Sequence, residues 1–164
     1  MLRWSREAPA IEWLWRSWCA HWVHLDLNHA LLNAAGFLLV AAWLSTSLTM
    51  IGWMIVAVAA IVSIDLGLWW LTHFEWYVGA SALIHALAAA GITVKVLDGE
   101  RFARWAALAG ILKLIFEQFS APILLVGGAT VATDAHVFGV VAGVLCGLVF
   151  ASTGWCRSRT VTLS

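Results

Sequence analysis

Five apolar stretches, each close to 20 residues long, restrict this chain to one kind of environment. They lie at about 27–45, 50–71, 77–97, 104–126 and 133–151, separated by short polar breaks such as "STSLT" and "LDGER". About 20 apolar residues are needed for a helix to cross a lipid bilayer, and a helix satisfies its own backbone hydrogen bonds there. The sequence therefore predicts an all-α, polytopic membrane helical bundle, with residues 1–164 forming a single domain in contact with the lipid bilayer.

The composition agrees with a membrane protein and excludes other classes. The chain is 63% hydrophobic and 11% charged, whereas soluble domains are about half apolar and about one quarter charged. Its formal net charge is zero, so no long-range field would gather nucleic acid, and we expect no nucleic-acid partner. The three cysteines, Cys19, Cys146 and Cys156, fit neither a disulfide framework nor a zinc site. We expect no metal and no cofactor.

Residues 1–26 are expected to form an interfacial segment. They carry charges and tryptophans, which prefer the headgroup level, but no continuous apolar core, so no cleavable signal peptide is expected. Positive charges flank the loop between the third and fourth spans and follow the fifth span, at Lys95, Arg101, Arg104, Arg157 and Arg159. The positive-inside rule places these on the cytoplasmic side and the N-terminus outside.

Polar residues gather near the starts of the odd-numbered spans, which all enter from the same outer face. They are His29 and Asn33 in the first span, Ser81 and His85 in the third, and Asp134 and His136 in the fifth. Ionisable residues inside a membrane are costly and are functional candidates, and a hydroxyl with imidazoles at one depth suggests a serine–histidine reaction centre. Taken singly, Ser81 is more often a packing or backbone-capping residue, and His29 with Asn33 can simply hydrogen-bond across helices.

Several separate motifs are similar to those of one protein family. They are "WR" at Trp15–Arg16, "HxxxN" from His29 to Asn33, "GxS" from Gly79 to Ser81, and "AHxxGxxxG" from Ala135 to Gly143. With these motifs in this order, the chain resembles the rhomboid intramembrane serine proteases. His85, where many rhomboids carry Tyr, and "KLIFEQ" at 113–118 resemble the rhombosortase branch.

The resemblance implies a role for each motif residue. Ser81 would be the nucleophile and His136 the base and then the acid, while the side chains of His29 and Asn33 would join the Ser81 backbone N–H in the oxyanion hole. Supporting roles fall to Gly79, His85 and Gly139, with His85 packing against the His136 ring and the glycines after His136 letting the third and fifth spans approach closely. Ser81 would lie about 6 to 8 Å inside the start of its span.

Other charged residues receive structural interpretations. Asp134 precedes His136 by two residues, which on a helix turns it about 200° away, so we expect a dyad rather than a triad, with Asp134 near the helix start as a cap. Lys113 and Glu117 are four residues apart, the spacing for mutual neutralisation within a span, with substrate contact as the alternative. Asp65 is expected at the membrane interface.

Two departures from the family pattern bear on activity. Ala82 follows the nucleophile, where rhomboids usually have Gly, so the site is expected to be slightly altered or less active. The helix that usually precedes "WR" in the six-span family core is expected to be missing, since Met1 lies only 14 residues upstream of Trp15. This predicts a misassigned start or a truncated product.

The resemblance also implies a substrate and a location. The substrate would be a membrane-anchored protein, cut in a single transmembrane segment or near the glycines of a C-terminal Gly-Gly-type sorting tail. The protein would lie in a bacterial inner membrane with its active site near the periplasmic face. The alternatives are an inactive rhomboid-like protein that binds transmembrane segments, and a b-type haem protein using His29, His85 or His136 as axial ligands. A transporter is disfavoured because no repeated or broken spans are found.

Overall fold

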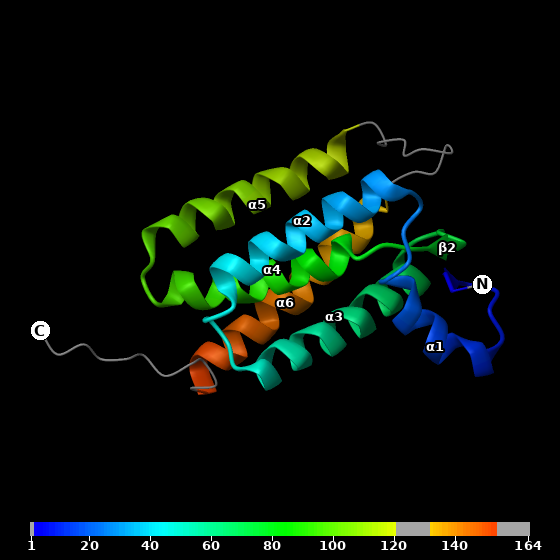
Figure 1. Cartoon of the computed structure of the whole chain (residues 1–164), viewed down its shortest axis with the longest axis horizontal. Helices are drawn as coiled ribbons and strands as arrows, with labels where there is room; N and C mark the ends of the chain where they lie inside the picture. Colours follow the sequence, from blue (N-terminus) through cyan, green and yellow to red (C-terminus); the bar gives the residue numbers. More distant parts are fainter. Residues whose placement is uncertain (1, 121–131, 154–164) are drawn as a thin grey trace, which may run out of the picture.

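The computed structural model describes residues 2–120 and 132–153, which form six helices and two very short strands (Figure 1). In chain order they are β1 (Trp4–Ser5), α1 (Ala10–Ala20), α2 (Leu27–Leu44), α3 (Met50–Leu71), β2 (Trp76–Tyr77), α4 (Ser81–Leu97), α5 (Arg101–Phe119) and α6 (Thr133–Thr153). Among the described helices, α2, α3 and α6 are long and apolar enough to cross a membrane, and α4 is a shorter apolar helix. The fold is all-α with three to four apolar candidate spans.

Helix α4 lies at the centre of the bundle, with α2, α3, α5 and α6 around it (Figure 1). Where the backbone of α4 contacts α6, the residues of α6 are glycines, which have no side chains. Carbons added as Cβ atoms at Gly139 and Gly143 would lie 2.3 and 2.1 Å from the carbonyl oxygens of Ala82 and Ala86. Only hydrogen fits at these two positions, so the backbones of α4 and α6 touch directly, as the glycine spacing in the sequence predicts.

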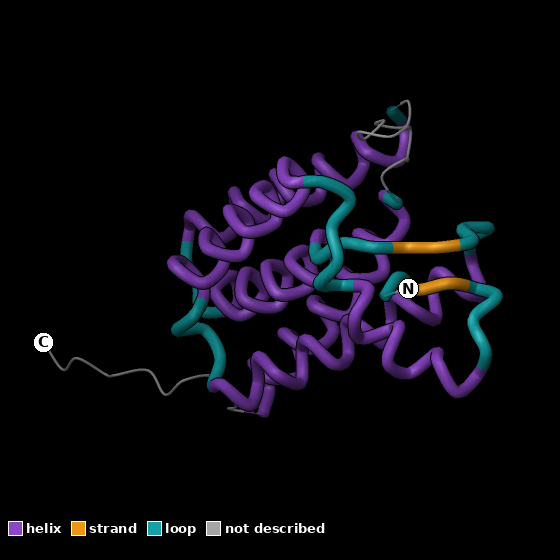
Figure 2. Tube along the Cα trace, turned by 45° about the vertical axis from the view of Figure 1, so that its right-hand side comes forward, coloured by secondary structure: helices purple, strands orange, loops and turns teal. Residues whose placement is uncertain are grey.

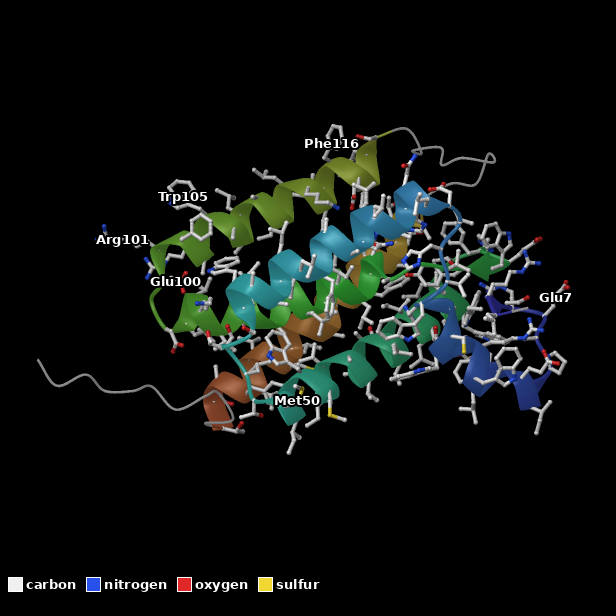
Figure 3. The ribbon with its side chains drawn as sticks, in the orientation of Figure 1. Glu7, Met50, Glu100, Arg101, Trp105 and Phe116 are labelled. Carbon is white, nitrogen blue, oxygen red and sulfur yellow. The ribbon has the colours of Figure 1, made fainter. Side chains whose placement is uncertain are left out.

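The outside of the bundle is apolar. Large side chains on α2 such as Leu32 and Leu39 are more than two-thirds exposed, and the same holds for Trp105 and Phe116 on α5, which point away from the other helices (Figure 3). A water-soluble protein of this size would not expose so large an apolar surface. Lipid is the solvent that fits it, so the chain is an integral membrane protein.

The N-terminal segment is attached to the bundle by a pairing that the sequence did not suggest. Strand β1 pairs antiparallel with β2, matching Trp4 to Tyr77 (Figure 2). The Arg6 guanidinium then donates to the carbonyl oxygens of Leu68, Trp69 and Thr72 at 2.6, 2.6 and 2.8 Å. These carbonyls belong to the last turn of α3 and to the residue after it, where a cation also complements the helix dipole.

Three sequence predictions need correction or lie outside the described residues. Helix α4 begins at Ser81, whereas the third span was predicted from residue 77, because Trp76–Tyr77 pair as a strand. Asp65 is 1% exposed and faces His21, so it lies in the core and not at the interface. Helix α5 ends at Phe119, and the predicted end of the fourth span at 121–126, together with Cys156, Arg157 and Arg159, lies outside the described residues.

The α4–α6 contact leads to a stability prediction. Gly143→Ala puts a methyl group against the Ala86 carbonyl, which neither backbone can move away from cheaply, so we expect the free energy of unfolding to fall by about 1 to 3 kcal/mol. Thermal unfolding in detergent micelles, followed by circular dichroism, measures the change. Gly110→Ala is the matched control, since no atom of the described part of the chain lies within 4 Å of a Cβ there. Equal losses in both variants would contradict the close contact.

Candidate active site

Ser81 is held at the first position of α4 by a tight turn. Gly79 has a φ of 122°, which L side chains rarely adopt, and a Cβ there would lie 2.8 Å from the His29 ring. The Gly79 N–H donates to the Ala20 carbonyl at 2.9 Å, and its own carbonyl accepts from the Tyr77 hydroxyl at 2.7 Å. The turn thereby connects β2, α1 and α4 and sets the direction in which Ser81 enters the helix.

The position of Ser81 differs from the expected one. It lies at the helix start rather than a full turn inside it, and the Ile84 N–H makes the first intrahelical bond, to the Ala80 carbonyl at 2.9 Å. The N–H groups before Ile84 therefore have no acceptor within the helix. The positive end of the α4 dipole also lies here. Both features suit an anion that forms next to Ser81.

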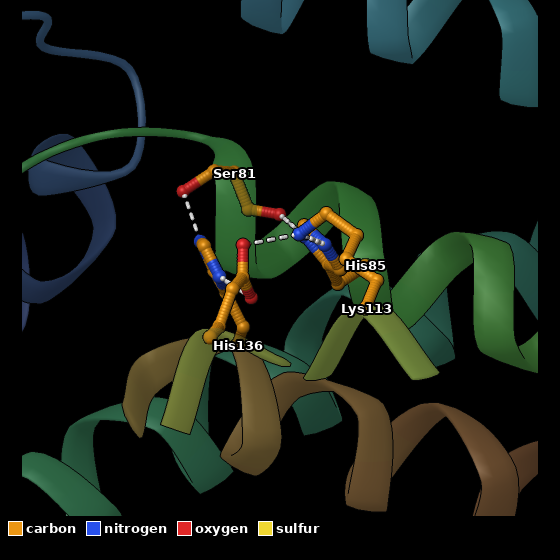
Figure 4. Close-up of polar contacts among 5 residues, drawn as sticks. Ser81, His85, Lys113 and His136 are labelled. Atoms are coloured by element: carbon orange, nitrogen blue, oxygen red, sulfur yellow. Dashed lines mark hydrogen bonds and ion pairs between the residues drawn. The ribbon is translucent and has the colours of Figure 1, made fainter. Parts of the chain in front are cut away.

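Ser81 and His136 are in hydrogen-bond contact. The distance from Ser81 Oγ to His136 Nε2 is 2.9 Å, across the α4–α6 interface, and Figure 4 shows the two side chains facing each other. His136 is 4% exposed. When the hydroxyl donates to Nε2, the proton of the neutral imidazole must be on Nδ1. This is the arrangement in which an imidazole can remove the serine proton.

His85 lies against the other face of this pair. Its ring stacks on His136, with centroids 4.3 Å apart and planes 16° apart. Its Nδ1 is 2.7 Å from the Ser81 carbonyl oxygen, and its Nε2 is 2.9 Å from Lys113 Nζ. A lysine ammonium can only donate, so Nε2 accepts and Nδ1–H donates to the carbonyl. The packing of His85 against His136 was predicted from the sequence and is confirmed.

Helix α5 brings a carboxylate that the sequence reasoning did not place in the site. Glu117 Oε1 is 2.5 Å from Lys113 Nζ, as their spacing predicts, but Oε2 lies 3.0 Å from His136 Nδ1. Asp134 has no bond to His136 among those of the described residues. The prediction of a shared layer of polar residues included only the starts of the odd-numbered spans. The fourth span ends where those spans begin, and this would have placed Glu117 in the same layer.

His29 and Asn33 lie on α2, and each has a buried polar atom without a partner among the described residues. The Asp26 side chain caps this helix by accepting from the His29 N–H at 2.8 Å. Asn33 is 7% exposed, and its Nδ2 has no partner among the described residues; the same is true of His29 Nδ1. Buried polar atoms of this kind are normally paired. The Asn33 amide and the ring nitrogen of His29, whose ring lies against the Gly79 turn, are therefore available to a group that enters the site.

The same side chains were considered as ligands of a metal or a haem. Ligand atoms of His85, Glu117 and His136 lie within 4.8 Å of one another, the spacing of a metal site. Lys113 Nζ already contacts His85 and Glu117, so a cationic group is supplied by the chain itself. Haem held between two histidines would need a free imidazole nitrogen on each, whereas both ring nitrogens of His85 and of His136 have partners. Of the three histidines, His29 alone has a ring nitrogen without a partner among the described residues.

His21 forms a second buried polar cluster beneath the Gly79 turn. It follows α1, is 0% exposed, stacks edge-on against Tyr77 at 5.5 Å, and lies 3.9 Å from Asp65. Burial lowers the pKa of His21 to about 4, since the charged ring would lose its water. Burial also raises the pKa of Tyr77. Both groups are therefore neutral at neutral pH and support the turn without charge.

The fold and the site together define a class: a polytopic helical membrane protein in which a serine and a histidine from two helices meet at one end of the bundle. The model of the Rhomboid domain matches residues 12–153. Comparison with curated proteins finds no match, and comparison with solved structures finds none either. The chain belongs to the rhomboid family, whose members are typically serine intramembrane proteases.

Burial of His21 predicts a pH dependence of stability. The unfolded chain takes up a proton near pH 6.5, whereas the folded His21 does so only near pH 4. Between these values the unfolded state binds more protons, so stability falls as the pH falls from 6.5 to 4. Thermal unfolding in detergent over this range should show a smaller slope for His21→Gln than for the wild-type protein. If the melting temperatures of the two proteins changed with pH in parallel, His21 would not contribute to the pH dependence of stability.

Proposed function

We propose that this protein is an intramembrane serine endopeptidase acting through Ser81 and His136. The observation that carries the proposal is the 2.9 Å contact between Ser81 Oγ and His136 Nε2 in a membrane protein of the rhomboid family. Neutral serine is a weak nucleophile, and a neighbouring base is the usual way to activate it. No cofactor is needed for this chemistry.

In the proposed reaction, Ser81 Oγ attacks the carbonyl carbon of the scissile peptide bond as its proton moves to His136 Nε2. The imidazolium then gives that proton to the amide nitrogen, the C–N bond breaks, and the amine leaves. A water molecule, deprotonated by the same nitrogen, hydrolyses the acyl-enzyme and restores Ser81. Water can arrive because Ser81 lies at the end of α4 and not in its middle.

The negative charge of the tetrahedral intermediate needs donors. We assign this role to the Ser81 backbone N–H with His29 and Asn33, and supporting roles to Gly79, His85 and Gly139. The unpaired Asn33 Nδ2 and the Ser81 backbone N–H, which has no acceptor within α4, support this assignment. One such donor is typically worth about 2.7 to 4 kcal/mol in the transition state.

The finer features of the proposal rest on the sequence. We place the protein in the rhombosortase branch because of His85, Lys113 and Glu117, with five spans crossing the membrane. The loop charges orient the site toward the periplasmic face of a bacterial inner membrane. The substrate is then a membrane-anchored protein whose single transmembrane or C-terminal sorting helix begins with Gly-Gly-type residues, because small residues let a helix unwind before attack.

The dyad is tested by serine labelling and cleavage. We expect a fluorophosphonate probe to label the wild-type protein, and Ser81→Ala or His136→Ala to lower cleavage of a membrane-anchored reporter by about 10³-fold or more. Ser152→Ala is the matched control, since Ser152 is exposed on α6 and, among the described residues, its hydroxyl bonds to the Val149 carbonyl alone. Cleavage that persists in Ser81→Ala would overturn the proposal. Binding of reporter without labelling or cleavage would instead indicate an inactive, segment-binding rhomboid-like protein.

The substrate class has its own test. A secreted reporter should be cut when it carries a C-terminal tail made of Gly-Gly, one apolar helix and a basic end. Replacement of both glycines by leucine should reduce cleavage about tenfold or more, because the helix then resists unwinding. Mass spectrometry of the released product locates the cut bond. Equal cleavage of both tails would exclude glycine recognition and leave the endopeptidase activity standing.

A further inference from the structure

We propose that Glu117 is a positioning residue that completes a Ser81–His136–Glu117 triad, with α5 as a third helix of the active site. The inference rests on the proposed function and adds a residue to it. Glu117 Oε2 lies 3.0 Å from His136 Nδ1, on the side of the ring opposite the nitrogen that faces Ser81. Each imidazole nitrogen therefore has one partner, and the two bonds require the same tautomer.

The carboxylate has two effects on the reaction. Before attack it accepts the Nδ1–H of His136, which leaves Nε2 unprotonated and aimed at Ser81 Oγ. After attack the imidazole carries the serine proton on Nε2 and a positive charge, which the ionised carboxylate stabilises across the same bond. The carboxylate keeps its own charge throughout, and no proton passes to it.

Glu117 is held in place by its neighbours. Its side chain is 11% exposed, and its second oxygen, Oε1, contacts Lys113 Nζ at 2.5 Å. Lys113 also donates to His85 Nε2 at 2.9 Å, and His85 donates to the Ser81 carbonyl at 2.7 Å and stacks on His136. With the Ser81–His136 bond, these contacts close a ring of five residues from α4, α5 and α6, in which the link from His85 is to the Ser81 backbone carbonyl (Figure 4).

A purely structural ion pair would not need this arrangement. Lys113 and Glu117 could neutralise each other one turn apart on α5 and face any polar neighbour. Instead the two oxygens of Glu117 are divided between a cation and His136 Nδ1. Within the described residues, α5 buries only Ala103, so little apolar packing accounts for the position of Glu117. The hydrogen bond from His136 Nδ1 to Glu117 is the contact through which the Lys113–Glu117 ion pair would act on the reaction.

The inference is tested with full-length protein in detergent micelles or liposomes. Glu117→Gln keeps the shape but removes the charge, and its amide can present NH₂ to Nδ1. We expect kcat to fall about 10²- to 10⁴-fold with KM nearly unchanged. Glu117→Asp keeps the charge and should recover part of the loss. Lys113→Met should cost roughly tenfold, since it removes one charge-assisted contact.

Gln118→Ala is the matched control, because Gln118 is the exposed neighbour of Glu117 on α5. Rates are normalised to the amount of Ser81 that the fluorophosphonate probe labels at completion. The NMR signal of the His136 Nδ1–H proton provides a readout independent of substrate: it should lie downfield in the wild-type protein and shift or vanish in Glu117→Gln.

The outcomes separate this inference from the proposed function. A wild-type protein that neither cleaves nor is labelled overturns the proposed function, and the positioning role with it. An active wild-type protein with unchanged kcat in Glu117→Gln overturns the triad alone. A lower melting temperature in Glu117→Gln, with normal kcat per labelled Ser81, also overturns it and leaves a structural ion pair.

Discussion

The direct contact between the backbones of α4 and α6 is the constraint on which the site depends. Gly139 lies against the carbonyl oxygen of Ala82, the residue after Ser81, and follows His136 by three residues. The same contact that packs the two helices therefore sets the distance between the hydroxyl and the imidazole. Any side chain at Gly139 would separate the helices and break the 2.9 Å hydrogen bond. In this protein, the α4–α6 interface both packs the helices and sets the Ser81–His136 geometry.

Charge inside the bundle is the second constraint. An isolated ionised group in the membrane is costly, and a pair is tolerated when each partner is satisfied. Lys113 and Glu117 meet this condition through each other and through His85 and His136. The cost of carrying two charges on α5 is offset by contacts with the site itself. This arrangement explains how a helix that buries so few residues can direct two ionisable side chains at His85 and His136, although the Lys113 side chain is 48% exposed.

The sequence predicted the parts of this structure that depend on period and length. The apolar stretches predicted the helices of the bundle. The glycine spacing predicted the close contact of α4 with α6, and the position of His85 predicted its packing on His136, and the structure confirms both contacts. The β1–β2 pairing was missed because strands of two residues have no detectable alternation. Asp65 was placed at the interface because a carboxylate is usually exposed, whereas His21 accompanies it in the core. Glu117 was missed because its contact depends on how α5 is rotated, which local spacing does not determine.

The start of α4 combines several properties that elsewhere require separate elements. The left-handed Gly79 turn ends β2 and lets Ser81 become the first helical residue. A first helical residue has a backbone N–H without an intrahelical acceptor, lies at the positive end of the dipole, and opens toward the end of the bundle. A serine one turn deeper would have its N–H bound within the helix and would lie farther from water. The shift of the helix start from residue 77 to Ser81 therefore gives this serine the surroundings that the proposed hydrolysis requires.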